Sequence, residues 1–172
     1  MSRAFLENES ADDPVVIPAR APLPPGSINY VTPRGLDLLR TELASLEAER
    51  TQVQTGSDEA ERSRQLALIN GRIANLNQRI ASAKVIDAHD QPHDEVRFGA
   101  TISLHSRTEK INVADKKLTI VGVDEADATH GRIAFTAPVA RAMLGKRVGD
   151  TVSFPAMQGV NIMEITKISY DE

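Results

Sequence analysis

Residues 32–85 decide the fold, and they read TPRGLDLLRTELASLEAERTQVQTGSDEAERSRQLALINGRIANLNQRIASAKV. Two runs within this stretch repeat at alternating spacings of three and four, which places their members on one face of a helix. The first run comprises Leu36, Leu39, Leu43, Leu46, Arg50 and Val53, and the second comprises Leu66, Ile69, Ile73, Leu76, Ile80 and Ala83. We therefore predict two amphipathic helices. An aromatic content of only 3% fits this, because a seam of leucine and isoleucine needs no aromatic rings.

The sequence indicates where the first helix begins and ends. Thr32 can cap a helix N-terminus, and Pro33 suits the first helical position. A short connector around Gly56 follows, and it lets both apolar stripes be buried only if the helices run antiparallel. We predict an antiparallel coiled-coil hairpin over residues 30–87 with its tip near 55–61. Its first arm, residues 33–54, would be about 33 Å long at 1.5 Å per residue.

One charged residue, Arg50, occupies a seam position. We expect its guanidinium either to reach solvent past its neighbours or to pair with an acid of the opposite arm.

The hairpin is preceded by a segment of different character. Residues 1–29 hold Pro14, Pro18, Pro22, Pro24 and Pro25, and prolines at this density prevent a continuous helix or sheet. We predict a flexible, acidic tail without function of its own. A short docking role for residues 1–5 stays open.

The remainder predicts an α+β domain. After a linker at 88–96, short alternating runs predict strands at 98–104, 118–123, 132–135, 151–154 and 160–168. Pro138 is placed to open one short helix and Gly145 to end it. We expect residues 97–172 to form a mostly antiparallel sheet with this helix packed against it. The predicted core comprises Phe98, Ile120, Val121, Ile133, Phe135, Leu144, Val148, Phe154, Ile162, Ile165 and Ile168.

Composition excludes several classes of protein. Cysteine is absent, which excludes disulfides, cysteine nucleophiles and cysteine-ligated metals. A formal net charge of −4 argues against gripping bare nucleic acid by neutralising its phosphates. No run approaches the ~18 apolar residues of a membrane span, and the first residues do not read as a signal sequence. We expect a cytoplasmic monomer without a membrane partner.

Motifs for catalysis are also missing. The sequence holds no glycine-rich phosphate loop and no G-x-S-x-G nucleophile motif. His89, His93, His105 and His130 fall in the linker or at strand ends, where a metal site would be poorly preorganised. We expect no enzymatic activity and no cofactor of the protein's own.

Acidic residues gather at the predicted tip. Asp58 and Glu61 are three apart, so both lie on one face of a helix and could share a divalent cation through their oxygens. Capping is the competing interpretation, because acids in the first turn of a helix are favoured by the helix dipole. Two or three carboxylates without a fixed cage would bind Mg²⁺ only weakly, so a partner would have to hold most of the ion's coordination shell.

Several short motifs occur in a recognisable order. They are Val31-Thr32-Pro33-Arg34-Gly35, Ala83-Lys84-Val85-Ile86-Asp87, Arg97-Phe98-Gly99-Ala100-Thr101, Ile120-Val121-Gly122-Val123-Asp124-Glu125-Ala126-Asp127, Ala137-Pro138-Val139-Ala140-Arg141-Ala142-Met143-Leu144-Gly145-Lys146 and Val148-Gly149-Asp150. Over about residues 30–170 the chain resembles the bacterial transcription elongation factors GreA and GreB. The resemblance implies a coiled-coil hairpin followed by a C-terminal domain of FKBP-like topology.

The resemblance also implies a function and a partner. Members of the family bind RNA polymerase at its secondary channel through the C-terminal domain and insert the coiled coil. Acidic tip residues help to hold an Mg²⁺ ion shared with the polymerase, which then cleaves the end of backtracked RNA. The factor is an accessory protein in this process and not the enzyme, and it approaches nucleic acid only through the transcription complex.

Site residues follow from the family's motifs. The tip motif runs Gly-Asp-x-x-Glu-Asn. Here Gly56 matches, Asp58 and Glu61 keep the acid spacing, Arg62 replaces the asparagine, and Glu59 is an additional acid that could substitute for either. The polymerase-binding turn before the short helix corresponds to Thr136, Ala137 and Pro138, with Arg141 one turn later.

One departure from the family leaves alternatives open. The hairpin looks shorter than that of GreA by roughly two helical turns per arm, about 10 Å of reach. We therefore favour a factor that occupies the channel over one that stimulates RNA cleavage. A module resembling the regulator of nucleoside diphosphate kinase, which has a much shorter coil, and a peptidyl-prolyl isomerase, suggested by topology alone, are the other hypotheses.

Overall fold

The computed structural model describes residues 14–108, 114–157 and 159–170. The chain forms two compact units, one grouping the described residues up to Arg20 with Leu39–Ala81, and the other grouping Ala21–Leu38 with the chain from Ser82 onward. This division groups residues 21–38, and the described residues from 82 onward, with the sheet, whereas the predicted domain limits were 30–87 and 97–172. Within the described residues, no helix is long and apolar enough to cross a membrane.

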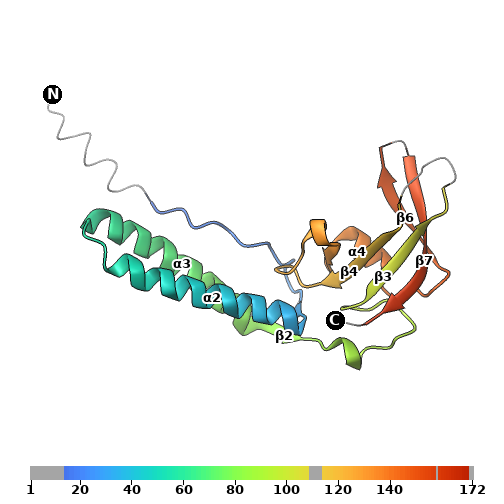
Figure 1. Ribbon diagram of the computed structural model, residues 1–172, viewed down its shortest axis with the longest axis horizontal. Coiled ribbons are helices and arrows are strands. Elements are labelled where there is room, and N and C mark those ends of the chain that lie inside the picture. Colours follow the sequence, from blue (N-terminus) through green and yellow to red (C-terminus); the bar gives the residue numbers. More distant parts are fainter. Residues whose placement is uncertain (1–13, 109–113, 158, 171–172) are drawn as a thin grey trace. The chain divides into compact units, whose positions relative to one another are not determined.

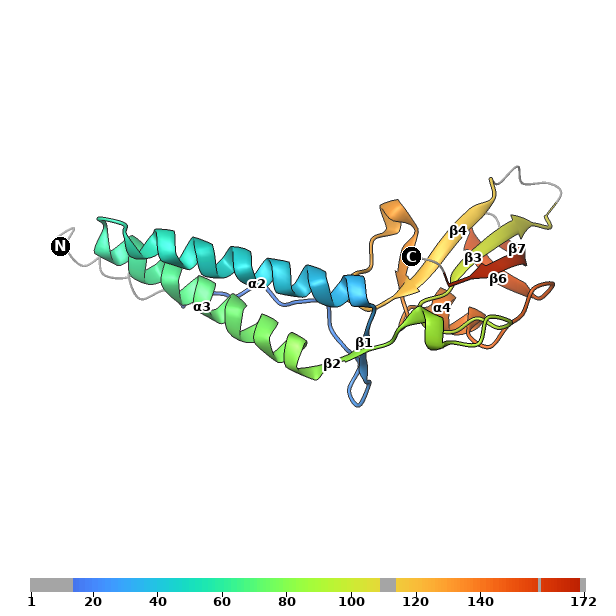
Figure 2. The ribbon, with the colours of Figure 1, turned by 60° about the horizontal axis from the view of Figure 1, so that its bottom comes forward.

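Two long helices dominate the first unit. Helix α2 (Pro33–Gln54) begins and ends where the sequence predicted, and α3 (Glu59–Ser82) lies beside it in Figures 1 and 2. Their contact is made by the predicted seam residues. Leu39, Leu46, Ile69, Ile73 and Leu76 are buried together, and Leu43, Val53 and Ile80 pack against them. The seam spacing therefore predicted the packing faces of both helices correctly.

Two seam positions behave differently. Ala83 was predicted as a helical seam residue but lies in a strand, because α3 ends at Ser82. The Arg50 guanidinium crosses to the other helix, where Nη1 donates to the Asn70 side-chain oxygen at 3.4 Å. Its partner is thus an amide and not the acid that the sequence suggested.

Two short strands flank the helices. Strand β1 (Asn29–Val31) pairs in parallel with β2 (Ala83–Val85), with Asn29 opposite Ala83. The Asn29 side chain donates to the Ser82 hydroxyl at 3.1 Å.

The predicted flexible tail, residues 1–29, is wrong at its end, because Asn29 is a buried strand residue. Residues 1–5, for which a docking role stayed open, lie outside the described residues. Three-residue strands carry too little alternation to be recognised from sequence.

The second unit is built on a five-stranded sheet in the order β5-β4-β3-β7-β6. Its strands are β3 (Thr101–Ser106), β4 (Lys116–Val121), β5 (Arg132–Ala134), β6 (Thr151–Ala156) and β7 (Gly159–Ser169). All neighbours are antiparallel except β4 and β5. A short helix, α4 (Pro138–Met143), and two 3-10 turns, η1 (Ala88–Asp90) and η2 (Ala128–His130), complete it. The predicted strands all exist, within a few residues at each end.

The core of this unit was predicted only in part. Phe98, Ile120, Val121, Phe154 and Ile165 are buried, whereas Ile133, Phe135 and Ile168 are half-buried. Three predicted core residues are wrong, because Leu144, Val148 and Ile162 are exposed by 41%, 58% and 45%.

Strand alternation explains the exposure of Ile162. Ile162 alternates on β7 with the buried Asn161 and Met163, so its side chain points to the outer face. Val96, from the predicted linker at 88–96, is fully buried in the core.

Candidate functional site

The turn between α2 and α3 carries the predicted acidic residues. The Asp58 carboxylate Oδ1 accepts from the backbone N–H of Glu61 at 3.3 Å, which is the geometry of a helix N-cap. Glu61 in turn accepts from Gln65 Nε2 through its Oε1 at 2.9 Å. Both carboxylates thus satisfy nearby donors of α3.

Arg62 adds a positive charge to the same turn. Nη1 of Arg62 donates to the Gly56 carbonyl at 2.9 Å, which folds the side chain back over the turn. Asp58, Glu61 and Arg62 line one shallow pocket of about 360 Å³. Glu59 does not line this pocket and is exposed at the start of α3. The structure therefore brings Asp58 and Glu61 together but leaves Glu59 apart.

A divalent cation requires more than this arrangement offers. Mg²⁺ is held octahedrally by oxygen ligands, and the pocket supplies two carboxylates that already accept hydrogen bonds and share the pocket with a guanidinium. Across the described residues, no group of three or more histidine, cysteine, aspartate or glutamate side chains could hold a metal. By themselves the tip residues do not fit a magnesium site.

The predicted polymerase-binding residues lie together at the start of α4. Pro138 occupies the first turn, and Ala137 is the N-cap residue without a side-chain hydrogen bond. The N–H of Arg141 donates to the Ala137 carbonyl at 3.0 Å, which closes the first helical turn. Pro138 and Arg141 are exposed and Thr136 is half-buried, so this turn offers a small mixed surface.

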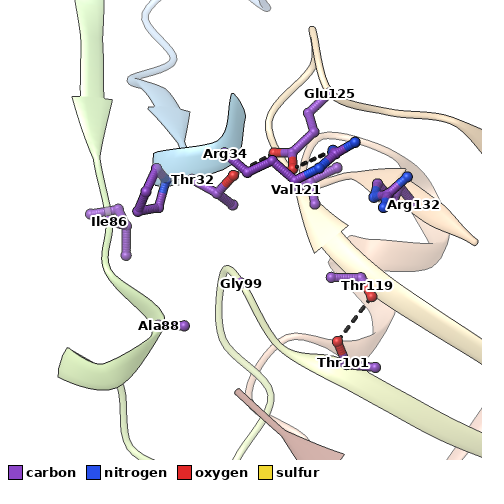
Figure 3. A pocket seen from close by; sticks show the side chains of 11 residues that line it. Thr32, Arg34, Ile86, Ala88, Gly99, Thr101, Thr119, Val121, Glu125 and Arg132 are labelled. Carbon is purple, nitrogen blue, oxygen red and sulfur yellow. Dashed lines mark hydrogen bonds and ion pairs between the residues drawn. The ribbon is translucent and has the colours of Figure 1, made fainter. Parts of the chain in front are cut away.

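A third site was not predicted. The Thr32 hydroxyl donates to Glu125 Oε2 at 2.6 Å, and Arg34 Nη1 lies 3.0 Å from Glu125 Oε1. Thr32 also accepts from the N–H of Gly35 at 2.9 Å, so it is the helix cap that the sequence indicated. The Glu125 side chain is only 4% exposed. We call Thr32, Arg34, Gly35 and Glu125 the Glu125 cluster; Figure 3 shows Thr32, Arg34 and Glu125.

Close approach is required at two glycines around this cluster. A Cβ atom on Gly35 would lie 2.8 Å from Glu125 Oε2. A Cβ atom on Gly122 would lie 2.6 Å from the Tyr30 carbonyl oxygen. Both glycines let the start of α2 and strand β1 lie against the loop that follows β4. No local pattern links Thr32 to Glu125, 93 residues later, so only the family motifs pointed to these positions.

A pocket of about 250 Å³ opens beside the Glu125 cluster. Thr101 and Thr119 share a hydrogen bond of 2.9 Å on one wall, and Arg132 lies on another, as Figure 3 shows. Its lining includes no histidine, cysteine or serine, and its three threonine hydroxyls are hydrogen-bonded to Glu125 or to each other. The one acid, Glu125, is already bound to two partners. This pocket is organised for packing and not for acid–base chemistry.

Comparisons with known proteins place the chain in a class. Residues 91–170 match the family model described as "Transcription elongation factor, GreA/GreB, C-term". Proteins named transcription elongation factor GreA are similar over a longer stretch. The one from Syntrophotalea carbinolica is 41% identical over 112 residues, which covers 65% of this chain and 68% of that protein. The one from Bradyrhizobium diazoefficiens is 45% identical over 101 residues, covering 58% of this chain and 62% of that protein.

The chain therefore belongs to the GreA/GreB family of transcription elongation factors. Solved structures are more distant. GreA/GreB from Nitrosomonas europaea is 22% identical with a TM-score of 0.41, and the two chains are covered by 82% and 98%. GreA factor homolog 1 of Thermus thermophilus is 18% identical with a TM-score of 0.38, covering 83% of this chain and 99% of that one. The assignment rests on the sequence relatives.

Proposed function

We propose that this chain is an elongation regulator that binds RNA polymerase and occupies its secondary channel without stimulating RNA cleavage. The proposal is carried by the contacts that the tip side chains already make. Asp58 caps α3, Glu61 accepts from Gln65, and Arg62 lines the same pocket as both. One oxygen of each carboxylate is thus committed to a donor of α3, which leaves fewer oxygens for a cation, and a guanidinium in the same pocket opposes cation binding.

The proposed polymerase contact is the turn at Thr136, Ala137 and Pro138 together with Arg141. Pro138 and Arg141 are exposed, and the fixed backbone of the α4 turn would present them without further ordering. We expect Arg141→Glu to weaken polymerase binding at least several-fold. Lys167→Glu, an equal charge change at an exposed position of β7, is the matched control.

Transcript cleavage in halted, backtracked elongation complexes tests the channel-occupancy proposal. Addition of the protein is expected to leave the transcript length unchanged while slowing the cleavage caused by a GreA protein added in competition. Shortening of the transcript that disappears in Asp58→Asn, but persists in Glu59→Gln, would contradict the proposal. Arg62→Asn, which restores the family's residue, is expected to move the protein toward cleavage.

Finer features of the fold belong to the same proposal. We infer that α2 and α3 form a coiled coil, which the regular seam and its buried leucines and isoleucines support. We infer FKBP-like topology for the sheet with α4. A peptidyl-prolyl isomerase site needs a pocket lined by aromatic side chains. Here Phe98 and Phe135 instead pack on Tyr30 in the core, with ring centroids 5.5–5.8 Å apart, so isomerase activity is not supported. The pocket at the Glu125 cluster is lined by no aromatic side chain.

A further inference from the structure

Gly71 lies in the interior of α3, where glycine weakens a helix relative to alanine. A Cβ atom at this position would lie 2.0 Å from Cδ1 and 2.7 Å from Cγ1 of Ile17. The space that a side chain would take is thus filled by a residue of the proline-rich segment before the hairpin. This contact gives a reason for a glycine in the middle of a long helix.

A second contact joins the same segment to the other helix. Arg20 forms a bidentate ion pair with Glu42 of α2, with Nη1–Oε1 at 2.7 Å and Nη2–Oε2 at 3.0 Å. Two parallel hydrogen bonds between a guanidinium and a carboxylate fix position as well as charge. The Arg20 side chain is 21% exposed and that of Glu42 45% exposed. Residues 14–20, which we call the strap, therefore contact both arms of the hairpin.

The strap has the composition of a segment that docks in extended form. It reads PVVIPAR, with a proline at each end of the apolar run and no glycine. Prolines restrict the free chain, so less conformational entropy is lost when it binds. The strap groups with the helices and not with the sheet in the division of the chain into compact units.

We propose that the hairpin face around Glu42 and Gly71 is a binding site for an extended segment with an apolar side chain three residues before an arginine. The chain's own strap occupies this site and thereby opposes insertion of the hairpin into its partner. The second part rests on the proposed function. Gly71 is 12 residues from Glu59, about 18 Å along the helix. A bound strap therefore thickens the hairpin within the part that would enter a channel.

Docking can be tested on the full chain by spin labelling. The sequence has no cysteine, and Val16 is 82% exposed, so a nitroxide on Val16→Cys would report the strap without replacing a contact. We expect broadening of hairpin amide signals around residue 71. Arg20→Glu should remove it, and the double variant Arg20→Glu with Glu42→Arg should restore it. Absence of broadening in the parent, or broadening that persists in Arg20→Glu, would overturn the docking proposal.

A steric variant gives an independent test. Gly71→Leu places a side chain where Ile17 lies, and it should remove the broadening while leaving the helical content unchanged. Asn77→Leu is the matched control, because it adds a leucine at an exposed position about a third of a turn around α3. Broadening that survives in Gly71→Leu contradicts the proposed site. Broadening that is also lost in Asn77→Leu would show that the effect is not specific to residue 71, which likewise contradicts the site.

The inhibitory role of the strap is tested by measuring the affinity of the protein for RNA polymerase. When only the open form binds, apparent affinity falls in proportion to its population. We expect Arg20→Glu and Gly71→Leu to bind polymerase on the order of fivefold more tightly than the parent, and the charge-swapped double variant to bind like the parent. Equal affinities in all variants would overturn the inhibitory role. If none binds polymerase, the proposed function fails, while the spin-label result still decides whether the strap docks.

Discussion

The carboxylates of this protein lie in two contrasting environments. In the Glu125 cluster, one carboxylate is almost fully buried and joins residues 93 positions apart through a threonine and an arginine. At the tip, Asp58 and Glu61 are exposed and bind donors within four residues of themselves. The first arrangement stabilises tertiary structure, whereas the second stabilises only the end of a helix. The same side-chain chemistry therefore predicts different consequences when it is removed.

The largest effect is expected for Glu125→Ala. It leaves the Thr32 hydroxyl and the Arg34 guanidinium without their shared partner. The buried Thr32 hydroxyl loses a hydrogen bond to a charged group, which contributes roughly 1.5–3 kcal/mol, and the 44% exposed Arg34 adds less because water can solvate it, so we expect a loss of about 3 kcal/mol. Urea unfolding followed by tyrosine fluorescence measures this, since Tyr30 and Tyr170 both belong to the sheet unit and tryptophan is absent.

Glu49→Ala, an exposed glutamate of α2, is the control and should change the free energy of unfolding by less than ~0.5 kcal/mol. A loss below ~1 kcal/mol in Glu125→Ala would show that the cluster contributes no more than an ordinary surface pair.

Gly122→Ala should rank second. Its Cβ would lie 2.6 Å from a backbone oxygen of Tyr30, so neither group can move without shifting β1. Forcing an extra methyl group into such a contact typically costs 1–3 kcal/mol, and we expect about 2 kcal/mol in the same urea experiment.

The tip offers the matched glycine. Gly56→Ala would place its Cβ 3.2 Å from the Val53 carbonyl, a milder approach in an exposed turn. It should lower the thermal stability of the helices by less than ~0.5 kcal/mol. Equal losses of unfolding free energy in Gly122→Ala and Gly56→Ala would contradict the proposed difference between the Glu125 cluster and the tip.

Asp58→Ala tests the tip carboxylate itself. Loss of an N-cap typically costs about 1 kcal/mol, and thermal unfolding followed by far-UV circular dichroism should show it. Asp58→Asn should be nearly neutral, because asparagine caps as well as aspartate. If the asparagine variant is as unstable as the alanine variant, the negative charge and not the cap stabilises α3.

The smallest effect is expected at Asp127, an example of a local carboxylate in the sheet unit. Hydrogen bonds from Thr129 and His130 lower its pKa from 3.8 to about 2. Because the pKa is lower in the folded state, the stabilisation is present above about pH 4 and is lost as the pH falls toward 2. NMR titration of the carboxyl carbon should show the low midpoint.

Thr129→Ala should move that midpoint back toward 3.8, whereas Thr151→Ala, at an exposed position on β6, should not. An unchanged midpoint in Thr129→Ala would mean that the hydroxyl is not the main cause.

Sequence reasoning succeeded where periodicity over many residues was available. The seam predicted the buried faces of both helices, because each side chain is one of several repeating contacts, while Thr32, Pro33 and the connector at Gly56 predicted the limits of α2. It failed at Ala83 and Ile162, where a single residue decides between helix and strand or between two faces of a strand. Glu125 could not be recognised as a partner of Thr32, since nothing in a local pattern specifies a contact across 93 residues.

The paired strands β1 and β2 have a consequence for how such proteins diversify. The chain enters and leaves the hairpin through two neighbouring three-residue strands, with Asn29 opposite Ala83 and Val31 opposite Val85. Whole heptads can be added to or removed from both arms together without changing this register. The lengths of α2 and α3 can therefore change in evolution while the paired strands β1 and β2 keep their register.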